Sequence, residues 1–400
     1  MNILVLTSNY KADDLPEWKT PVVHYFVREW VAQGYNVLVI HNNTIFPNWL
    51  HLLLGILKRL SFKKAGYLIA PHVEEMEYIL DNVPVVRLNI SKKIPQKPFT
   101  EKSYQDQFFK LKRVLREKNF IPDVIVGHWI TPQLRLVYEL KRELNKPACL
   151  IIHEEFPILE RDYPNTWKEY LNNMDLLGYR SKNIKNKFIS TYKVNDISSF
   201  LCYSGIDENI IDLSHIRRLN KPIKTITFVG ILIERKFPES ILHSVNYLSN
   251  KISFKINYIG DGYLTSQLEK IAKKYDLLKQ VTFHGRLSRA KVMEKLNQTD
   301  VFIMISERET FGLVYLEAMA CGCITIAARH EGMDGIIVDG ENGFLCKAGD
   351  WMELAVILQK IYAMNEIDIS TISENAILKA HSMTDKNLAI KYIGELQKII

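Results

Sequence analysis

The feature that most constrains the fold is a regular alternation of short apolar segments and amphipathic segments between residues 225 and 346. Its clearest instance begins at residues 301–305, a continuous apolar run of the kind that forms a parallel strand covered on both faces. Helix formers dominate residues 311–320, and residues 323–328 are apolar again and enriched in Ile and Thr. Repeated strand–helix units of this length predict an α/β fold with parallel sheets and right-handed crossovers.

The length of the chain indicates two domains, because 400 residues suffice for two cores of ordinary size. We predict a first doubly wound domain over residues 1–205, with an insertion at residues 45–72. A linker at residues 206–222, a second doubly wound domain at 223–383 and a last helix at 384–400 complete the predicted organisation.

Composition is typical of a folded globular protein, with 47% hydrophobic and 24% charged residues. The net charge of +7 suits anionic partners such as a nucleotide sugar or a membrane surface, but it does not single out nucleic acid. The five cysteines are odd in number and show no metal-site spacing, so we expect reduced core residues in a cytoplasmic protein. No apolar run approaches the roughly 20 residues of a membrane-spanning helix.

Two glutamates bracket the start of the predicted helix at residues 311–320. Glu309 lies in the loop after the strand, at the edge where open α/β sheets bind ligands. Gly312 lacks a Cβ where the first N–H groups of the helix emerge, and these groups favour a phosphate or diphosphate. Glu317 lies in the second helical turn, so both carboxylates could accept hydrogen bonds from sugar or ribose hydroxyls. Alternatively, Glu309 is an acid favoured by the helix dipole and Glu317 pairs with a lysine.

These residues also form a motif, Glu309-x-Phe311-Gly312-x-x-x-x-Glu317, followed by Asp339-Gly340-x-Asn342-Gly343. The motif resembles the Glu-x7-Glu signature of retaining, nucleotide-sugar-dependent glycosyltransferases of the GT-B fold, family 4. The resemblance implies two Rossmann-like domains that face a central cleft and a C-terminal helix that crosses back to the first domain. It also implies a nucleotide-sugar donor that contacts Phe311, Gly312, Leu313 and Glu317, with Glu309 as a catalytic residue that holds sugar hydroxyls.

A second motif, residues 228–236, resembles the family's loop that grips the donor diphosphate with an Arg directly after Gly and a Lys six residues after it. Gly230 and Lys236 match, but Ile231 replaces the Arg. Arg235 could supply the second cation from the neighbouring position, and Arg286 is a further donor-binding candidate. An Arg-Lys pair on a loop is otherwise a solvated surface, which is the alternative interpretation.

Two histidines follow predicted strands of the first domain, His128 after residues 123–126 and His153 after residues 148–152. Both would lie at the carboxyl edge of the sheet, although a lone histidine is usually a structural residue. The resemblance implies that His128 acts near the transferred sugar and that His153 is on the acceptor or sugar side. Thr20, also placed on that side, stands where the family has a glycine in the loop after the first strand.

The insertion at residues 45–72 carries many large apolar side chains and a basic end, and no Asp or Glu occurs between His41 and Val73. One interpretation is an interfacial helix whose basic end contacts anionic lipid. The other is a core helix followed by a solvated basic turn, because apolar residues occur on nearly every face of the segment.

The combined prediction is a cytoplasmic glycosyltransferase, with possible peripheral contact at the inner face of the cell membrane. The donor would be a nucleotide-diphosphate sugar and the acceptor a hydroxyl of a glycan or a lipid-linked molecule, in surface polysaccharide or glycoconjugate synthesis. No Asp-x-Asp triplet occurs, so we predict no metal and no cofactor. The alternatives are a nucleotide-sugar epimerase of the same architecture and a non-catalytic homologue that binds a nucleotide sugar and partners a transferase.

Overall fold

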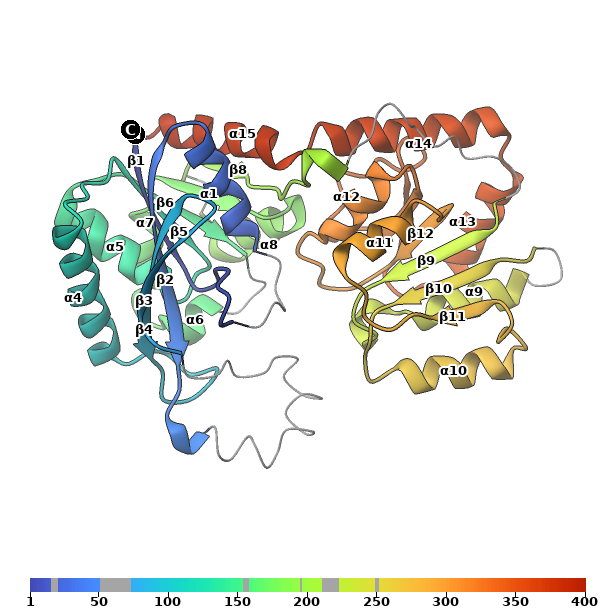
Figure 1. Cartoon of the computed structure of the whole chain (residues 1–400), viewed down its shortest axis with the longest axis horizontal. Helices are drawn as coiled ribbons and strands as arrows, with labels where there is room; N and C mark the ends of the chain where they lie inside the picture. The colour runs from blue at the N-terminus through green and yellow to red at the C-terminus, as the bar shows by residue number, and fades with distance from the viewer. Residues whose placement is uncertain (16–20, 51–72, 154–157, 195, 211–222, 249–251) are drawn as a thin grey trace. The chain divides into compact units, whose positions relative to one another are not determined.

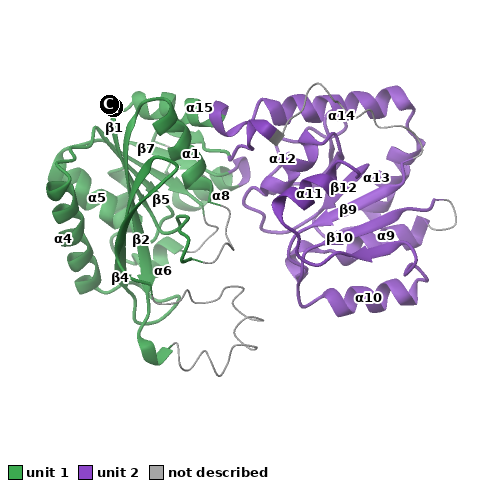
Figure 2. Ribbon diagram, viewed as in Figure 1, with its two compact units in different colours: residues 1–180, 184–203, 388–400 green, residues 181–183, 204–387 purple. Residues whose placement is uncertain are grey.

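The computed structural model describes residues 1–15, 21–50, 73–153, 158–194, 196–210, 223–248 and 252–400 (Figure 1). The chain forms two compact units (Figure 2): unit 1 comprises residues 1–180, 184–203 and 388–400, and unit 2 comprises residues 181–183 and 204–387. The predicted α/β class with two parallel-sheet units is confirmed. Thr20, the segment 51–72 and residues 211–222 of the predicted linker lie outside the described residues.

Unit 1 is built on an eight-stranded sheet in the order β3-β4-β2-β1-β5-β6-β7-β8. The strands are β1 (Asn2–Thr7), β2 (Asn36–Ile45), β3 (Met76–Leu80), β4 (Val83–Ser91), β5 (Val124–His128), β6 (Ala148–Ile152), β7 (Leu176–Tyr179) and β8 (Ser199–Leu201). The helices are α1 (Val22–Ala32), α4 (Glu101–Glu117), α5 (Gln133–Leu144), α6 (Ile158–Asp162), α7 (Trp167–Asn172) and α8 (Lys182–Tyr192). All neighbouring strands are parallel except β3 and β4.

Helices cover both faces of this sheet, which explains why its central strands are continuous apolar runs. Helices α4, α5, α7 and α8 share one core with the strands. On the opposite face, α1 packs against the end of α15 (Asp385–Gln397), because the Tyr392 ring lies 5.3 Å from Phe26 and 4.9 Å from Trp30. Trp30 Nε1 also donates a hydrogen bond to the carbonyl of Ala389 at 3.2 Å.

The β3–β4 hairpin was not identified from the sequence. Strand β3 is an exposed edge strand with glutamates in and before it, so it lacks the apolar signature of the others. The two strands are joined by Asp81 and Asn82, which have φ angles of 49° and 62°. Positive φ at both central residues is the geometry of a two-residue hairpin turn, and the Asp-Asn pair was the signal available in the sequence.

Unit 2 is built on a six-stranded parallel sheet in the order β11-β10-β9-β12-β13-β14. The strands are β9 (Thr225–Val229), β10 (Lys255–Ile259), β11 (Val281–Phe283), β12 (Val301–Met304), β13 (Ile324–Ala328) and β14 (Phe344–Cys346). The helices are η1 (Glu208–Ile210), η3 (Glu234–Lys236), α9 (Glu239–Leu248), α10 (Thr265–Lys274), α11 (Arg289–Leu296), α12 (Leu313–Ala320), α13 (Trp351–Ala363) and α14 (Glu366–His381). The order reverses between β9 and β12, and such a switch point is where open sheets of this kind bind ligands.

Among the described residues, we find no helix that is both long enough and apolar enough to span a bilayer.

Candidate functional site

The loops after β9 and β12 bring together the basic and acidic residues predicted to hold the donor. Lys236 Nζ lies 2.6 Å from Glu309 Oε2, and the two side chains are only 11% and 14% exposed. Arg235 Nη1 lies 3.9 Å from the same carboxylate oxygen. A backbone hydrogen bond of 2.8 Å from the amide of Glu307 to the carbonyl of Arg235 joins the two loops. The substitute cation predicted at Arg235 therefore does lie beside Lys236 and Glu309.

Close backbone approaches fix the position of the loop after β9. A Cβ on Gly260 would come within 2.0 Å of the Gly230 carbonyl oxygen, and a Cβ on Gly262 within 2.1 Å of that of Leu232. Only glycines fit there, so the loop after β10 packs directly on the loop that carries Lys236. Ile231, which replaces the family's Arg, is 56% exposed.

The N-terminus of α12 begins beside this group of charges. Gly312 is the N-cap with φ 78°, and a Cβ there would come within 2.6 Å of the Tyr315 ring. The helix therefore starts at Leu313, two residues later than predicted, and the buried Phe311 precedes it. No side chain of the described residues caps α12, so its first N–H groups can meet an anion.

Glu331 is a residue of this site that the sequence analysis missed. It follows β13, it is buried, and its Oε2 accepts a hydrogen bond of 2.9 Å from the backbone amide of Glu309. A Cβ on the adjacent Gly332 would come within 2.6 Å of the Phe311 backbone. The available signal was an acid in the loop after the strand next to β12, at the same edge of the sheet.

Glu317 is held by Arg289 of α11. Its Oε1 lies 2.9 Å from Nε and 2.8 Å from Nη2 of the guanidinium, and its side chain is 10% exposed whereas that of Arg289 is 44% exposed. The alternative in which Glu317 pairs with a lysine is thus replaced by a forked pairing with arginine, which fixes the carboxylate direction. Arg286 is exposed on the loop after β11, and Leu313 is half-buried at the start of α12.

The two histidines of unit 1 contact one another. His128 Nδ1 lies 3.0 Å from His153 Nε2, and the His153 ring stacks on Trp129 with centroids 4.0 Å apart. His128 has no exposed surface, and its Nε2 lies 3.4 Å from the Tyr392 hydroxyl. His128 therefore lies behind His153 in this structure, which differs from the direct sugar contact predicted for it. Trp129 and Tyr392 were not singled out from the sequence.

Both imidazoles are neutral near pH 7. Burial, followed by the nearby Arg180 guanidinium, lowers the pKa of His128 to about 3. The same two causes and the neighbouring His128 hold the pKa of His153 well below its usual value. A hydrogen bond between two neutral rings needs one donor and one acceptor, so the pair shares a single proton at this contact.

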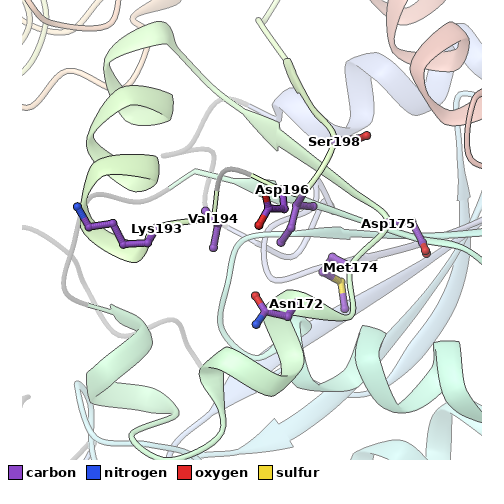
Figure 3. A pocket seen from close by; sticks show the side chains of 8 residues that line it. Asn172, Met174, Asp175, Lys193, Val194, Asp196 and Ser198 are labelled. Atoms are coloured by element: carbon purple, nitrogen blue, oxygen red, sulfur yellow. The ribbon is translucent and has the colours of Figure 1, made fainter.

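A pocket of about 370 Å³ lies elsewhere in unit 1 (Figure 3). Its lining includes Asp175, Ser198 and Lys193, at the amino ends of β7 and β8 and the end of α8. This is the opposite edge from the one where parallel sheets bind ligands. Asp175 Oδ2 already pairs with Lys141 Nζ at 2.5 Å and accepts from the amide of Ala148 at 2.8 Å, so we assign no chemistry to this pocket.

Among the described residues, no three His, Cys, Asp or Glu side chains are grouped so as to hold a metal ion.

Comparison with known proteins defines the class. Residues 211–378 match the family described as glycosyl transferases group 1. An uncharacterized glycosyltransferase of Methanocaldococcus jannaschii is 27% identical over 327 residues, which cover 80% of this chain and 86% of that protein. The N-acetyl-alpha-D-glucosaminyl L-malate synthase of Bacillus anthracis is 24% identical over 253 residues, 60% of this chain and 65% of the synthase.

Solved structures share the fold. The sucrose-phosphate synthase of Thermosynechococcus elongatus has a TM-score of 0.71 and 16% identity, covering 100% of this chain and 98% of that one. Anabaena HepE, crystallised with UDP, has a TM-score of 0.70 and 17% identity, covering 100% of both chains. The chain has the GT-B fold, and the family match and the relatives support an enzyme that transfers sugars. The match to the group 1 glycosyltransferases covers residues 211–378, and the likeness to the archaeal glycosyltransferase extends over 80% of the chain.

Proposed function

We propose that this enzyme transfers a sugar from a nucleotide-diphosphate-sugar donor to a hydroxyl of a glycan or lipid-linked acceptor, with retention of anomeric configuration. The observation that carries the proposal is the contact of Lys236 with Glu309 beside the uncapped N-terminus of α12, at the switch point of the unit 2 sheet. The UDP bound to the structurally similar HepE supports a nucleotide donor.

The chemistry of the proposed reaction assigns a role to each group. Ionisation of the donor's anomeric bond places negative charge on the leaving diphosphate, and fixed cations and N–H groups stabilise that charge. Lys236 and Arg235 would provide the cations, and the first turn of α12 would provide the N–H groups. Glu309 would then accept hydrogen bonds from sugar hydroxyls, and Glu317, oriented by Arg289, from the ribose hydroxyls.

The site is preorganised in the absence of ligand because Lys236 and Glu309 neutralise one another while both are largely buried. When a diphosphate arrives, the ammonium can contact it and Glu309 at once, since a lysine carries three N–H donors. The pair therefore links recognition of the phosphate to the position of the carboxylate at the sugar.

The test is thermal stabilisation of the full chain by UDP-, GDP- and ADP-sugars, followed by a transfer assay with the donor that stabilises it. Lys236→Met should abolish most of the stabilisation and reduce turnover by about 10²–10³, as loss of one charge-stabilising group does elsewhere. Lys112→Met is a matched control, because it breaks the exposed pair of Lys112 with Glu143 in unit 1. Equal stabilisation of Lys236→Met and wild type would disprove the assigned site.

Incubation of the donor without acceptor separates the two enzyme alternatives. A transferase leaves the nucleotide sugar intact or hydrolyses it slowly, whereas an epimerase converts it to an isomer that chromatography resolves. Isomer formation without acceptor would replace the transferase proposal.

A place in surface polysaccharide or glycoconjugate synthesis, with peripheral membrane contact through residues 45–72, also remains a proposal. Its support is the composition of that segment, with Lys58, Arg59, Lys63 and Lys64 and no acidic residue. We expect co-sedimentation with anionic vesicles that added salt weakens, because exposed charges are screened. Absence of binding at low salt would remove the membrane part of the proposal.

A further inference from the structure

Tyr392, near the end of α15, is buried beside the two histidines of unit 1, and the proposed reaction gives it no role. It is 2% exposed, and its ring centroid lies 4.9 Å from that of Trp30 and 5.1 Å from that of Phe200. These aromatic contacts hold the ring in place and leave the hydroxyl as its one polar atom. A buried tyrosine hydroxyl usually has a hydrogen-bond partner, so its contacts show what the residue does.

The unit 1 sheet presents three polar side chains on one face, near the Tyr392 hydroxyl. The register pairs His128 of β5 with Ile151 of β6, and side chains alternate along a strand. Cys149 and His153 lie two positions before and two positions after Ile151, so both share a face with His128. The core that the sheet shares with α4 and α5 lies on the opposite face.

The Tyr392 hydroxyl contacts two of these side chains. Its oxygen lies 3.4 Å from His128 Nε2, and it forms a second hydrogen bond with the Cys149 thiol. An unprotonated imidazole nitrogen is a good acceptor, whereas a thiol sulfur is a weak one. We therefore assign the phenolic O–H as donor to His128 Nε2, while the S–H of Cys149 donates to the tyrosine oxygen.

This assignment fixes the protons of both imidazoles. A neutral imidazole carries one N–H, so a His128 ring that accepts at Nε2 has its proton on Nδ1. His128 Nδ1 then donates to His153 Nε2, which lies 3.0 Å away. The proton of His153 must in turn lie on Nδ1, the ring nitrogen that does not contact His128. His153 is 8% exposed whereas His128 has no exposed surface, so His153 is the member of the pair that a substrate can contact.

We propose that Tyr392 is a positioning residue, which acts through His128 to make His153 a hydrogen-bond donor toward the substrates. The stack on Trp129, with centroids 4.0 Å apart, fixes the plane of the His153 ring, and Tyr392 fixes which ring nitrogen carries the proton. In this form His153 stabilises an oxygen that gains negative charge, and it does not take the proton of an acceptor hydroxyl at Nδ1. The effect on the rate rests on the proposed transferase function, whereas the position of the protons does not.

The experiment is nitrogen-15 NMR of the full chain, labelled at histidine, near pH 7 and without ligand. Protonated and unprotonated ring nitrogens resonate far apart, and the signals missing in His128→Asn and His153→Asn assign the two rings. The wild type should show the Nδ1–H form of both. In Tyr392→Phe the donor to His128 Nε2 is lost, so both rings should shift together toward the Nε2–H form.

The same variant tests the effect on transfer. Tyr392→Phe keeps the packed ring and removes only the hydroxyl, so kcat should fall about ten-fold, as expected for one lost hydrogen bond, while KM for the donor stays unchanged. The matched control is Tyr192→Phe, because Tyr192 is a unit 1 tyrosine whose hydroxyl donates to Glu160 at 2.7 Å. It should keep both the Nδ1–H forms and the wild-type kcat.

The possible failures are distinguishable. An Nε2–H form of His128 in the wild type, or unchanged rings in Tyr392→Phe, would overturn the proposal. A shift of equal size in Tyr192→Phe would do the same, as would a lower melting temperature of Tyr392→Phe with wild-type spectra and kcat, which is the result of a purely structural role. A wild type that transfers no sugar from any tested donor overturns the proposed function instead, and the spectra still decide whether Tyr392 sets the protons of the pair.

Discussion

At the residue scale, the candidate donor site depends on how its loops are held as much as on its charged groups. The buried Glu331 fixes the backbone of Glu309, whose side chain in turn holds Lys236. A carboxylate that pairs with a main-chain amide acts on position and need not touch the substrate. Sequence patterns for catalytic residues do not record such an interaction, because it depends on which loops the sheet brings together.

Removal of the Glu331 carboxylate should therefore loosen the loop that carries Glu309, and it should leave the proposed contact of Lys236 with the donor phosphate in place. We expect Glu331→Ala to reduce kcat by roughly ten-fold, the effect of about 1.4 kcal/mol in a transition-state contact, with a smaller change in KM for the donor. Glu331→Gln keeps an acceptor oxygen and should restore most of the rate. Glu341→Ala, at an exposed position, is the control. An unchanged kcat in Glu331→Ala would show that Glu309 is held by other contacts.

A second prediction at this scale concerns the substitution of Gly312. The stability lost on substitution has two parts, one from the left-handed backbone and one from the approach to the Tyr315 ring. Gly312→Ala places a Cβ at φ 78° and within 2.6 Å of the Tyr315 ring. Gly340→Ala places one at φ 80° with no atom within 4 Å, so it reports the cost of the left-handed backbone alone. We expect about 1 kcal/mol of lost unfolding free energy for Gly340→Ala and about 2–3 for Gly312→Ala, measured by urea denaturation. Equal losses would mean that the Tyr315 ring moves aside freely.

The residues that the sequence predicted and those it missed differ in kind. Glu309, Gly312 and Lys236 were identifiable because they stand at fixed spacings within a motif next to a strand end. Arg235 was named only as a substitute for the cation missing at Ile231, and the structure was needed to place it 3.9 Å from Glu309. Tyr392, which contacts His128 from the far end of the chain, could not be assigned because the pairing of distant elements is not encoded locally.

At the element scale, the β3–β4 hairpin holds the loop that follows β1. The guanidinium of Arg87 in β4 is 1% exposed and pairs with Asp14 of that loop through contacts of 2.6 and 2.7 Å. The Tyr78 hydroxyl in β3 donates to the carbonyl of Lys11 at 2.8 Å. The hairpin thus gives the sheet an edge and holds Lys11 and Asp14 at the carboxyl end of the sheet.

Asp14→Ala should destabilise unit 1 although Asp14 itself is 46% exposed. Among the described residues, the change leaves the buried Arg87 guanidinium with one hydrogen bond, from Nε to the Glu74 carbonyl, so we expect a loss of roughly 1–3 kcal/mol in urea denaturation. Glu117→Ala breaks an exposed pair with Arg113 and should cost less than about 0.5 kcal/mol. If the two variants lose the same stability, the Asp14 contact contributes no more than a surface pair.

The elements of the fold were predictable to different degrees for the same physical reason. Strands β1, β5, β6, β12 and β13 are buried on both faces, so burial dictates their apolar runs and makes them visible. The exposed edge strand β3 has no such requirement. The predicted start of α12 was two residues too early. The helix cannot include residue 311, because the tertiary structure holds Gly312 in a left-handed conformation that overrides local helix propensity.

At the scale of the whole molecule, buried neutral histidines make stability depend on pH. The pKa of His128 is about 3 in the folded state against an ordinary value of 6.5, so below about pH 6.5 the unfolded chain binds a proton that the folded chain does not. The contribution of His128 to the unfolding free energy is therefore fully present above pH 6.5. It decreases by about 1.4 kcal/mol per pH unit as the pH falls toward 3. Burial shifts the pKa of His153 in the same direction, so both histidines weaken unit 1 over the same range.

Between pH 7 and pH 5 the shift of His128 alone should lower the unfolding free energy by roughly 2 kcal/mol, and His153 acts in the same direction. The lowered pKa values of the paired carboxyls Asp14 and Glu101 act only below their ordinary values of 3.8 and 4.5, which lie outside this window. His24 of unit 1, whose pKa burial also lowers, contributes in the same direction as the pair. Urea unfolding followed by tryptophan fluorescence would report mainly unit 1, since Trp30, Trp129 and Trp167 lie there. His128→Asn should reduce the pH dependence, whereas the exposed His330→Gln should retain it in full. A constant unfolding free energy from pH 7 to pH 5 would mean that the folded histidines bind protons as readily as those of the unfolded chain, so that burial does not lower their pKa.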